Sequence, residues 1–144
     1  NPPARNFAYL AGMALDTVTA IPQAGSLPAD DLGRAGPEDI LLAMTFKPYR
    51  REVVEAVETA IAQGVRVIGV SDSLASPILS HADHRFMVPT DTPQAFTSTV
   101  ALSAFLETLM AFVIADADGT ALANIEAFHD RRHSVGIYWE EPSS

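Results

Sequence analysis

Two short apolar runs dominate the hydrophobic pattern of the chain, at residues 39–46 and 65–70. The second reads V-R-V-I-G-V and is rich in β-branched side chains, with almost no polar alternation. That pattern is typical of a strand covered on both faces, as in a parallel sheet with helices on either side. We therefore expect both runs to form central strands of a parallel sheet.

Between these runs, residues 51–63 repeat apolar side chains at helical spacing and end at Gly64. Glycine commonly follows the last helical residue because it adopts a left-handed conformation without strain. The order of strand, helix and strand predicts one β-loop-α-β unit with a right-handed crossover.

The rest of the pattern predicts elements on both sides of this unit. They are a helix at 6–15, a strand at 16–21, helical turns at 27–32 and 78–82, an edge strand at 85–88, and helices at 96–115 and 120–132. Thr120 is expected to be the N-cap of the last helix. The helix at 96–115 carries Glu107 as its one charged residue, which favours a place in the centre of the domain or in an oligomer interface.

Composition indicates one globular domain. The chain has 144 residues, of which 48% are hydrophobic and 19% charged. No apolar run approaches the roughly 18–20 residues that span a bilayer, so a cytoplasmic location is the default expectation. Cysteine is absent, which excludes disulfides and thiolate metal sites.

The formal net charge of −9 argues against binding of this segment to a nucleic-acid backbone, which requires clustered Lys and Arg. The sequence begins Asn-Pro-Pro without an initiator methionine, which suggests a fragment. Any contact with DNA is therefore expected from a part of the protein outside this sequence.

Hydroxyl and cationic side chains follow the predicted strands. They are Thr45, Lys47 and Arg50 after the first central strand, Ser71, Ser73 and Ser76 after the second, and residues 97–99, including Ser98, after the edge strand. Ligands of open α/β sheets bind beyond the carboxyl ends of the strands. Hydroxyls, backbone N–H groups and a helix N-terminus together suit a phosphate. The alternative interpretation is that these serines and threonines only cap turns and helices.

Three segments carry a family resemblance: T-F-K-P-Y-R-R-E-V-V-E, then G-V-R-V-I-G-V-S-D-S-L-A-S-P-I-L-S-H-A-D, then F-T-S-T-V-A-L. Together they closely resemble the sugar isomerase (SIS) domain of RpiR-type bacterial transcriptional regulators, over essentially all of residues 1–144. The resemblance implies a three-layer α/β/α sandwich on a mainly parallel, flavodoxin-like sheet of five strands. It also implies phosphosugar binding, dimerisation and a preceding helix-turn-helix DNA-binding domain.

The sequence departs from the family pattern at two places. The first strand and its glycine-serine loop are not seen, so one wall of the site is missing or lies elsewhere. Where SIS domains carry a loop such as S-x-S-G-x-T, residues 45–50 read T-F-K-P-Y-R. Lys47 and Arg50 could replace the lost glycine and hydroxyls by direct charge, or they could point into solvent beside a degenerate site.

Metal binding and catalysis find little support in the sequence. His81 and His84 have no visible partner ligands and are interpreted as surface or turn residues, and His129 and His133 lack a third ligand. Asp72 is interpreted as orienting its loop by accepting backbone N–H bonds of its own turn. We expect neither a metal nor a cofactor.

The sequence thus predicts an effector-sensing and dimerising domain of a transcriptional regulator that binds a phosphorylated sugar or related metabolite and does not catalyse a reaction. Thr45, Ser71, Ser73 and Ser98 are the first candidates for phosphate contacts, with Lys47, Arg50 and Ser76 as second choices. Two alternatives remain: a stand-alone isomerase of aldose and ketose phosphates, and a vestigial SIS domain that only dimerises through residues 96–113.

Overall fold

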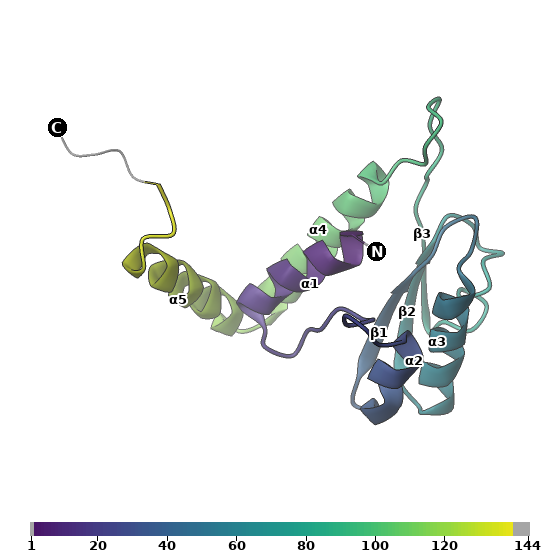
Figure 1. Ribbon diagram of the computed structural model, residues 1–144, viewed down its shortest axis with the longest axis horizontal. Coiled ribbons are helices and arrows are strands. Elements are labelled where there is room, and N and C mark those ends of the chain that lie inside the picture. Colours follow the sequence, from purple (N-terminus) through teal and green to yellow (C-terminus); the bar gives the residue numbers. More distant parts are fainter. Residues whose placement is uncertain (1, 140–144) are drawn as a thin grey trace. The chain divides into compact units, whose positions relative to one another are not determined.

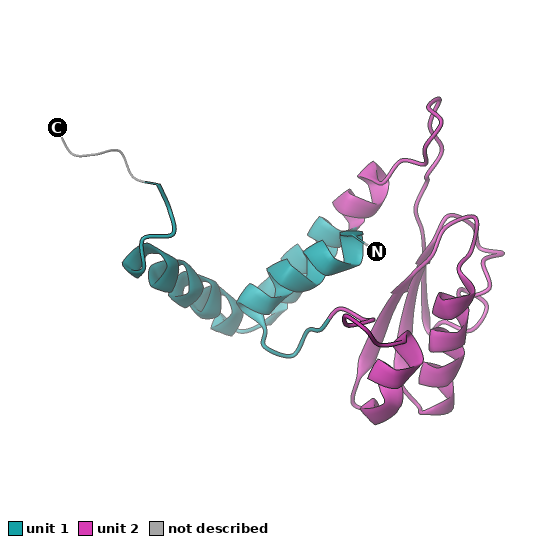
Figure 2. Ribbon diagram, in the orientation of Figure 1, with its two compact units in different colours: residues 1–19, 106–144 teal, residues 20–105 magenta. Residues whose placement is uncertain are grey.

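The computed structural model describes residues 2–139 (Figure 1). The chain divides into two compact units (Figure 2). The sheet unit comprises residues 20–105, and the helical unit comprises, of the residues described, 2–19 and 106–139. Helix α4, Val100–Asp116, contributes its first residues to the sheet unit and the rest to the helical unit.

The sheet unit contains three parallel strands in the order β1-β2-β3: β1 Ile40–Met44, β2 Arg66–Ser71 and β3 His84–Met87. In this register Ile40 lies opposite Arg66, and Ile68 lies opposite His84. Helix α3, Arg51–Ala62, connects β1 to β2, and Gly64 follows it with φ +76°. The two central runs, the helix between them, its glycine and the edge strand predicted at 85–88 are confirmed, whereas the described residues form three strands rather than five.

One face of this sheet carries the core of the unit. Ala43 and Val67 are buried there against Val57 and Ala60 of α3. The short helices α2, Pro28–Asp31, and η1, Leu32–Arg34, follow the predicted turns at 27–32, and η1 contributes Leu32 to the same core. In Figure 1, α2 and α3 lie together beside the strands.

Gly69 sits at the centre of this face because the chain after β2 returns close to it. A Cβ at Gly69 would lie 2.6 Å from Leu79 Cδ2 and 3.1 Å from Ala82 Cβ. Leu79 is fully buried. Residues 78–81 form a turn here, rather than the helical turn predicted at 78–82.

The opposite face of the sheet is covered only in part within the sheet unit. Val70 is fully buried. The centroid of the Phe86 ring lies 4.9 Å from the centroid of the Phe105 ring, near the start of α4. Ile40, at the free edge of β1, is 55% exposed. The expectation that β2 is covered on both faces therefore holds for its second half, whereas Ile68 is only partly buried.

Residues 16–21 were expected to form a strand, and this prediction is wrong. They form a turn and an irregular segment that pairs with no strand among residues 2–139. Val, Ile and Thr favour strands only where a neighbouring strand accepts their backbone hydrogen bonds and packs against their side chains.

The helical unit contains α1, Pro2–Ala14, the later part of α4, and α5, Thr120–Ser134. Asn124 Nδ2 of α5 donates to the carbonyl of Ala14 at 2.8 Å. Arg132 donates to the Tyr9 hydroxyl at 3.0 Å, and its hydrogen bonds with Tyr138 and Tyr9 raise the pKa of the guanidinium above its usual value.

Helices α1, α4 and α5 confirm the helices predicted at 6–15, 96–115 and 120–132, with shifted ends. The N-cap of α5 is Gly119, with φ +79°, rather than Thr120. No single helix among the residues described is long and apolar enough to cross a membrane, although α4 and α5 together reach that length and composition across a sharp bend.

Candidate functional site

The candidate site lies at the carboxyl ends of β1 and β2, which are neighbours in the sheet. Thr45 follows β1 directly, and its N–H donates to the Val70 carbonyl at 3.3 Å. Ser71 is the last residue of β2. The loops at residues 45–50 and 71–76 therefore leave the sheet side by side, as the order of the apolar runs predicts.

Ser71 joins these two loops through its side chain. The hydroxyl is fully buried and donates to the Thr45 carbonyl at 2.6 Å, with Asp72 Oδ1 at 3.2 Å. A hydroxyl has one proton to donate, and the shorter contact takes it. In this arrangement the Ser71 hydroxyl holds the Thr45 backbone in place.

Two further bonds fix the loop after β1. Asp72 Oδ2 accepts the N–H of Lys47 at 3.4 Å, and Thr45 Oγ1 accepts the N–H of Arg50 at 3.3 Å. Asp72 thus orients a loop, as predicted, but its backbone partner comes from the neighbouring loop rather than from its own turn. The sequence could not show this contact, because its partners are 25 residues apart.

Ser73 is the hydroxyl in these loops that is best placed to donate to a ligand. The side chain is half-buried, and its Oγ accepts the N–H of Ala75 at 3.2 Å. That bond uses a lone pair and leaves the hydroxyl proton, for which the described part of the chain offers no acceptor.

Ser76 ends the second loop and is almost completely buried, at 1% exposure. Its N–H donates to the Ser73 carbonyl at 3.0 Å, and its carbonyl accepts the N–H of Leu79 at 3.0 Å. The side-chain oxygen, by contrast, has no hydrogen-bond partner among residues 2–139. A ligand could reach this oxygen only if the loop moved.

We expect Ser76→Ala to raise the free energy of unfolding by about 1 kcal/mol, because a buried polar group without a partner destabilises the folded state. Urea unfolding followed by circular dichroism measures the change. A loss of stability of about 1 kcal/mol or more would show that the hydroxyl has a partner in the folded protein.

Ser98 belongs to a third loop, just before α4. Its N–H donates to the Thr90 carbonyl at 3.0 Å, and its Oγ accepts the N–H of Val100 at 3.3 Å. Both bonds are local, and none joins this loop to the loops after β1 and β2 in the part of the chain described. Ser98 therefore caps its own turn here, and its convergence on the other hydroxyls stays a prediction.

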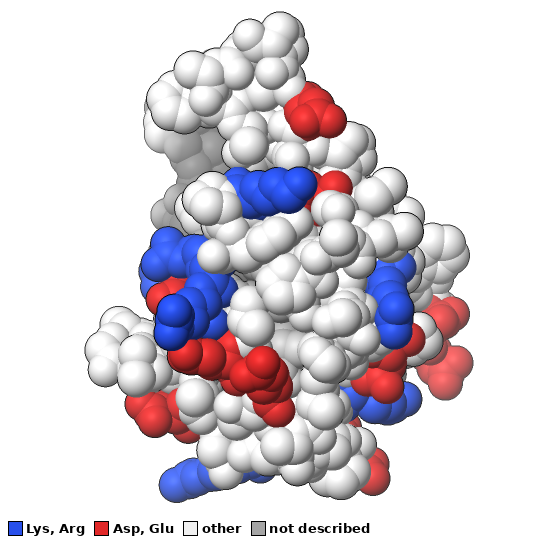
Figure 3. Space-filling model, turned by 90° about the vertical axis from the view of Figure 1, so that its right-hand side faces the viewer, with Lys and Arg blue, Asp and Glu red and all other residues white. Residues whose placement is uncertain are grey.

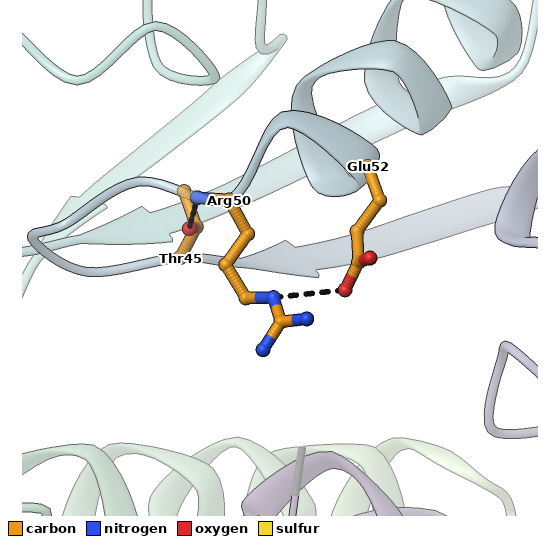
Figure 4. Close-up of polar contacts among 3 residues, drawn as sticks. All are labelled: Thr45, Arg50 and Glu52. Carbon is orange, nitrogen blue, oxygen red and sulfur yellow. Dashed lines mark hydrogen bonds and ion pairs between the residues drawn. The ribbon is translucent and has the colours of Figure 1, made fainter.

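The cations of the site are exposed. Arg50 is the N-cap residue of α3, and no side-chain hydrogen bond caps this helix. Arg50 Nε lies 2.9 Å from Glu52 Oε1 (Figure 4). The sequence analysis does not identify this ion pair. Lys and Arg lie in several separate places on the face shown in Figure 3, most of them next to Asp or Glu, rather than in one basic surface.

The arrangement suits a small anion. The first turn of α3, the exposed cations Lys47 and Arg50, and the free proton of Ser73 all belong to the two adjacent loops. Helix N-termini, cations and hydroxyl donors each stabilise a phosphate. Residues 2–139 contain no group of three or more His, Asp or Glu that could hold a metal ion.

Comparison with solved structures shows the fold. The sugar isomerase domain of an RpiR transcription factor from Sphaerobacter thermophilus aligns with a TM-score of 0.81 and 24% identity, covering 90% of this chain and 72% of that one. The NanR protein of Vibrio vulnificus, in complex with ManNAc-6P, aligns with a TM-score of 0.76 and 17% identity, covering 93% of this chain. This chain spans about half (52%) of the NanR chain.

A putative sugar-phosphate isomerase from Listeria monocytogenes aligns less well, with a TM-score of 0.54 and 19% identity over 93% of this chain and 68% of that one. No curated protein matches the sequence. The SIS domain family matches residues 2–115, which include the whole sheet unit and both loops of the candidate site. The chain therefore belongs to the SIS domain family.

Proposed function

We propose that this chain is the effector-sensing domain of a transcriptional regulator and that it binds a phosphorylated sugar between the loops after β1 and β2. The observation that carries the proposal is the presence of an uncapped helix N-terminus, two exposed cations and a hydroxyl donor on two adjacent loops. Structural neighbours that are regulators, one of them in complex with ManNAc-6P, support it.

The predicted residues take different roles in this proposal. Ser73, Lys47 and Arg50 contact the phosphate, because each has a donor that the folded chain leaves open to solvent or only partly occupies. Thr45 and Ser71, both buried, hold the two loops at their spacing. Ser76 and Ser98 contact ligand only after their loops rearrange.

Dimerisation and DNA binding complete the proposal. The exposed apolar side chains Val100 and Phe112 of α4 suit an interface with a second copy. DNA contacts belong to an N-terminal domain outside this sequence. A ligand that binds one arrangement of the dimer more tightly shifts the protein toward that arrangement, which changes the spacing of attached DNA-binding domains.

A panel of hexose and amino-sugar phosphates, including ManNAc-6P, tests the proposal by thermal denaturation. A ligand at about 100 times its Kd stabilises the folded domain by about 2.7 kcal/mol. The corresponding unphosphorylated sugars should have no such effect. Stabilisation by no member of the panel would favour a domain that only dimerises, and conversion of a bound sugar phosphate into its isomer would favour the enzyme.

Ser73→Ala is expected to weaken binding of the stabilising sugar phosphate about ten- to hundredfold, because one hydrogen bond to a charged group is worth about 1.5–3 kcal/mol. Isothermal titration calorimetry measures the change. The thermal stability of the unliganded protein should stay close to that of the wild type, since Ser73 Oγ makes one local bond in a half-buried turn.

Ser80→Ala is the matched control. Ser80 lies in the turn that follows, is exposed, and donates to the Pro77 carbonyl at 2.9 Å, so this variant also loses one local bond. Its affinity should equal that of the wild type. Equal affinities for all three proteins would remove Ser73 from the site.

A further inference from the structure

Arg50 is held by its backbone where the loop after β1 meets α3. The Arg50 N–H donates to Thr45 Oγ1 at 3.3 Å (Figure 4), and Arg50 is the N-cap residue of α3. Thr45 is 4% exposed. The starting point of the Arg50 side chain is therefore fixed relative to the end of β1, whereas the side chain itself is 71% exposed.

The Arg50 guanidinium is only partly occupied by Glu52. The ion pair joins Nε to Oε1 at 2.9 Å (Figure 4), and neither terminal nitrogen has an ion-pair or hydrogen-bond partner among residues 2–139. A guanidinium can bind a carboxylate or phosphate through two parallel N–H bonds. The pair observed here uses one, so the remaining donors stay open to a second anion.

Glu52 also places a negative charge in the first turn of α3. No side chain caps the backbone N–H groups there. A negative charge is stabilised at this end of a helix. The carboxylate therefore interacts with both groups that would attract a phosphate: the Arg50 guanidinium and the start of α3.

We propose that Glu52 is a specificity-determining residue that competes with the ligand's anionic group for Arg50 and for the start of α3. The inference rests on the proposed function of the site. It means that the domain discriminates ligands by charge, because Glu52 weakens binding of a doubly charged phosphate more than binding of a singly charged group.

Glu52 could either hold Arg50 in place for the ligand or repel the ligand's anionic group, and the sizes of the two effects decide which one dominates. An exposed ion pair couples its partners by less than about fivefold in an equilibrium constant, so Glu52 contributes little to the placement of Arg50. A carboxylate about 6 Å from a doubly charged anion in water at physiological salt weakens its binding by about three- to tenfold. For a singly charged anion the factor is the square root of this, about two- to threefold.

Small anions provide the test, because they need no knowledge of the sugar. Methyl phosphate is largely doubly charged at pH 7.5, since phosphate monoesters lose their second proton near about pH 6, and methyl sulfate is singly charged. We expect Glu52→Gln to bind methyl phosphate about three- to tenfold more tightly than the wild type, and methyl sulfate less than about threefold more tightly. Dissociation constants come from NMR titration of the backbone amides of residues 45–52 other than Pro48.

Glu55→Gln is the matched control, since Glu55 is exposed on the same helix and the variant has the same net charge. It should bind both anions as the wild type does. In an Arg50→Gln background, at least half of the gain from Glu52→Gln, on a logarithmic scale, should disappear because the group competed for is gone.

Weaker binding in Glu52→Gln would show that Glu52 positions Arg50 and would overturn the inference. An equal gain in Glu55→Gln, or an undiminished gain without Arg50, would reduce the effect to net charge and would also overturn it. Binding by the wild type with no gain in Glu52→Gln leaves the proposed function in place and removes the inference. Binding of neither anion by any variant removes both.

Discussion

Replacing Leu79 with alanine is expected to lower the free energy of unfolding by about 2–5 kcal/mol, the range for a fully buried leucine. Leu79 is 0% exposed and packs against the sheet face over Gly69. The loss has two parts, the burial of the removed methyl groups and the cavity they leave. Urea unfolding of the wild type and the variant, followed by circular dichroism, measures it.

Gly69→Ala provides the test of this packing. Its Cβ would lie 2.6 Å from Leu79 Cδ2, so in the wild-type background it should cost about 1–3 kcal/mol by overpacking. In the Leu79→Ala background the same methyl enters the vacated space and should cost clearly less. Additive effects of the two substitutions would contradict the contact.

The sequence predicts those parts of the fold whose signals are local. The apolar run at 65–70, the helical repeat at 51–63 and the stop at Gly64 each depend on neighbouring residues, and the structure has a strand, a helix and a left-handed glycine there. Residues 16–21 have the composition of a strand and form none. A strand needs a partner, and the sequence of one segment cannot show whether a partner lies beside it.

In the candidate site, too, the sequence predicts some features, and others depend on contacts that it cannot show. Adjacency of the loops after β1 and β2 follows from two consecutive parallel strands, which sequence order predicts. The role of each serine does not, because it depends on where the hydroxyl proton goes. Ser71 and Ser73 are two residues apart in one loop, yet the first is buried and bonded to Thr45, and the second is half-buried with its proton free.

Ser71→Ala is expected to lower the free energy of unfolding by about 1–3 kcal/mol, because it removes a buried hydrogen bond and leaves the Thr45 carbonyl without its donor. The two loops lose one of the contacts between them. Asp72 still accepts the N–H of Lys47, so the loops should keep their positions in the folded state. Affinity for a sugar phosphate should therefore change by less than about threefold at temperatures where the variant is folded. One lost hydrogen bond to a charged group would weaken binding about tenfold or more.

Ser73→Ala makes the opposite combination, with stability retained and affinity reduced, so the two variants together separate a hydroxyl that holds the loops from one that meets the ligand. Both substitutions remove one oxygen from the same loop, and each is the control for the other. Loss of affinity in Ser71→Ala without loss of stability would mean that the Ser71 hydroxyl turns from the Thr45 carbonyl to the ligand. In that case the loop after β2 would rearrange on binding, and the buried Ser76 oxygen, which has no partner among residues 2–139, would become the next group to test for ligand contact.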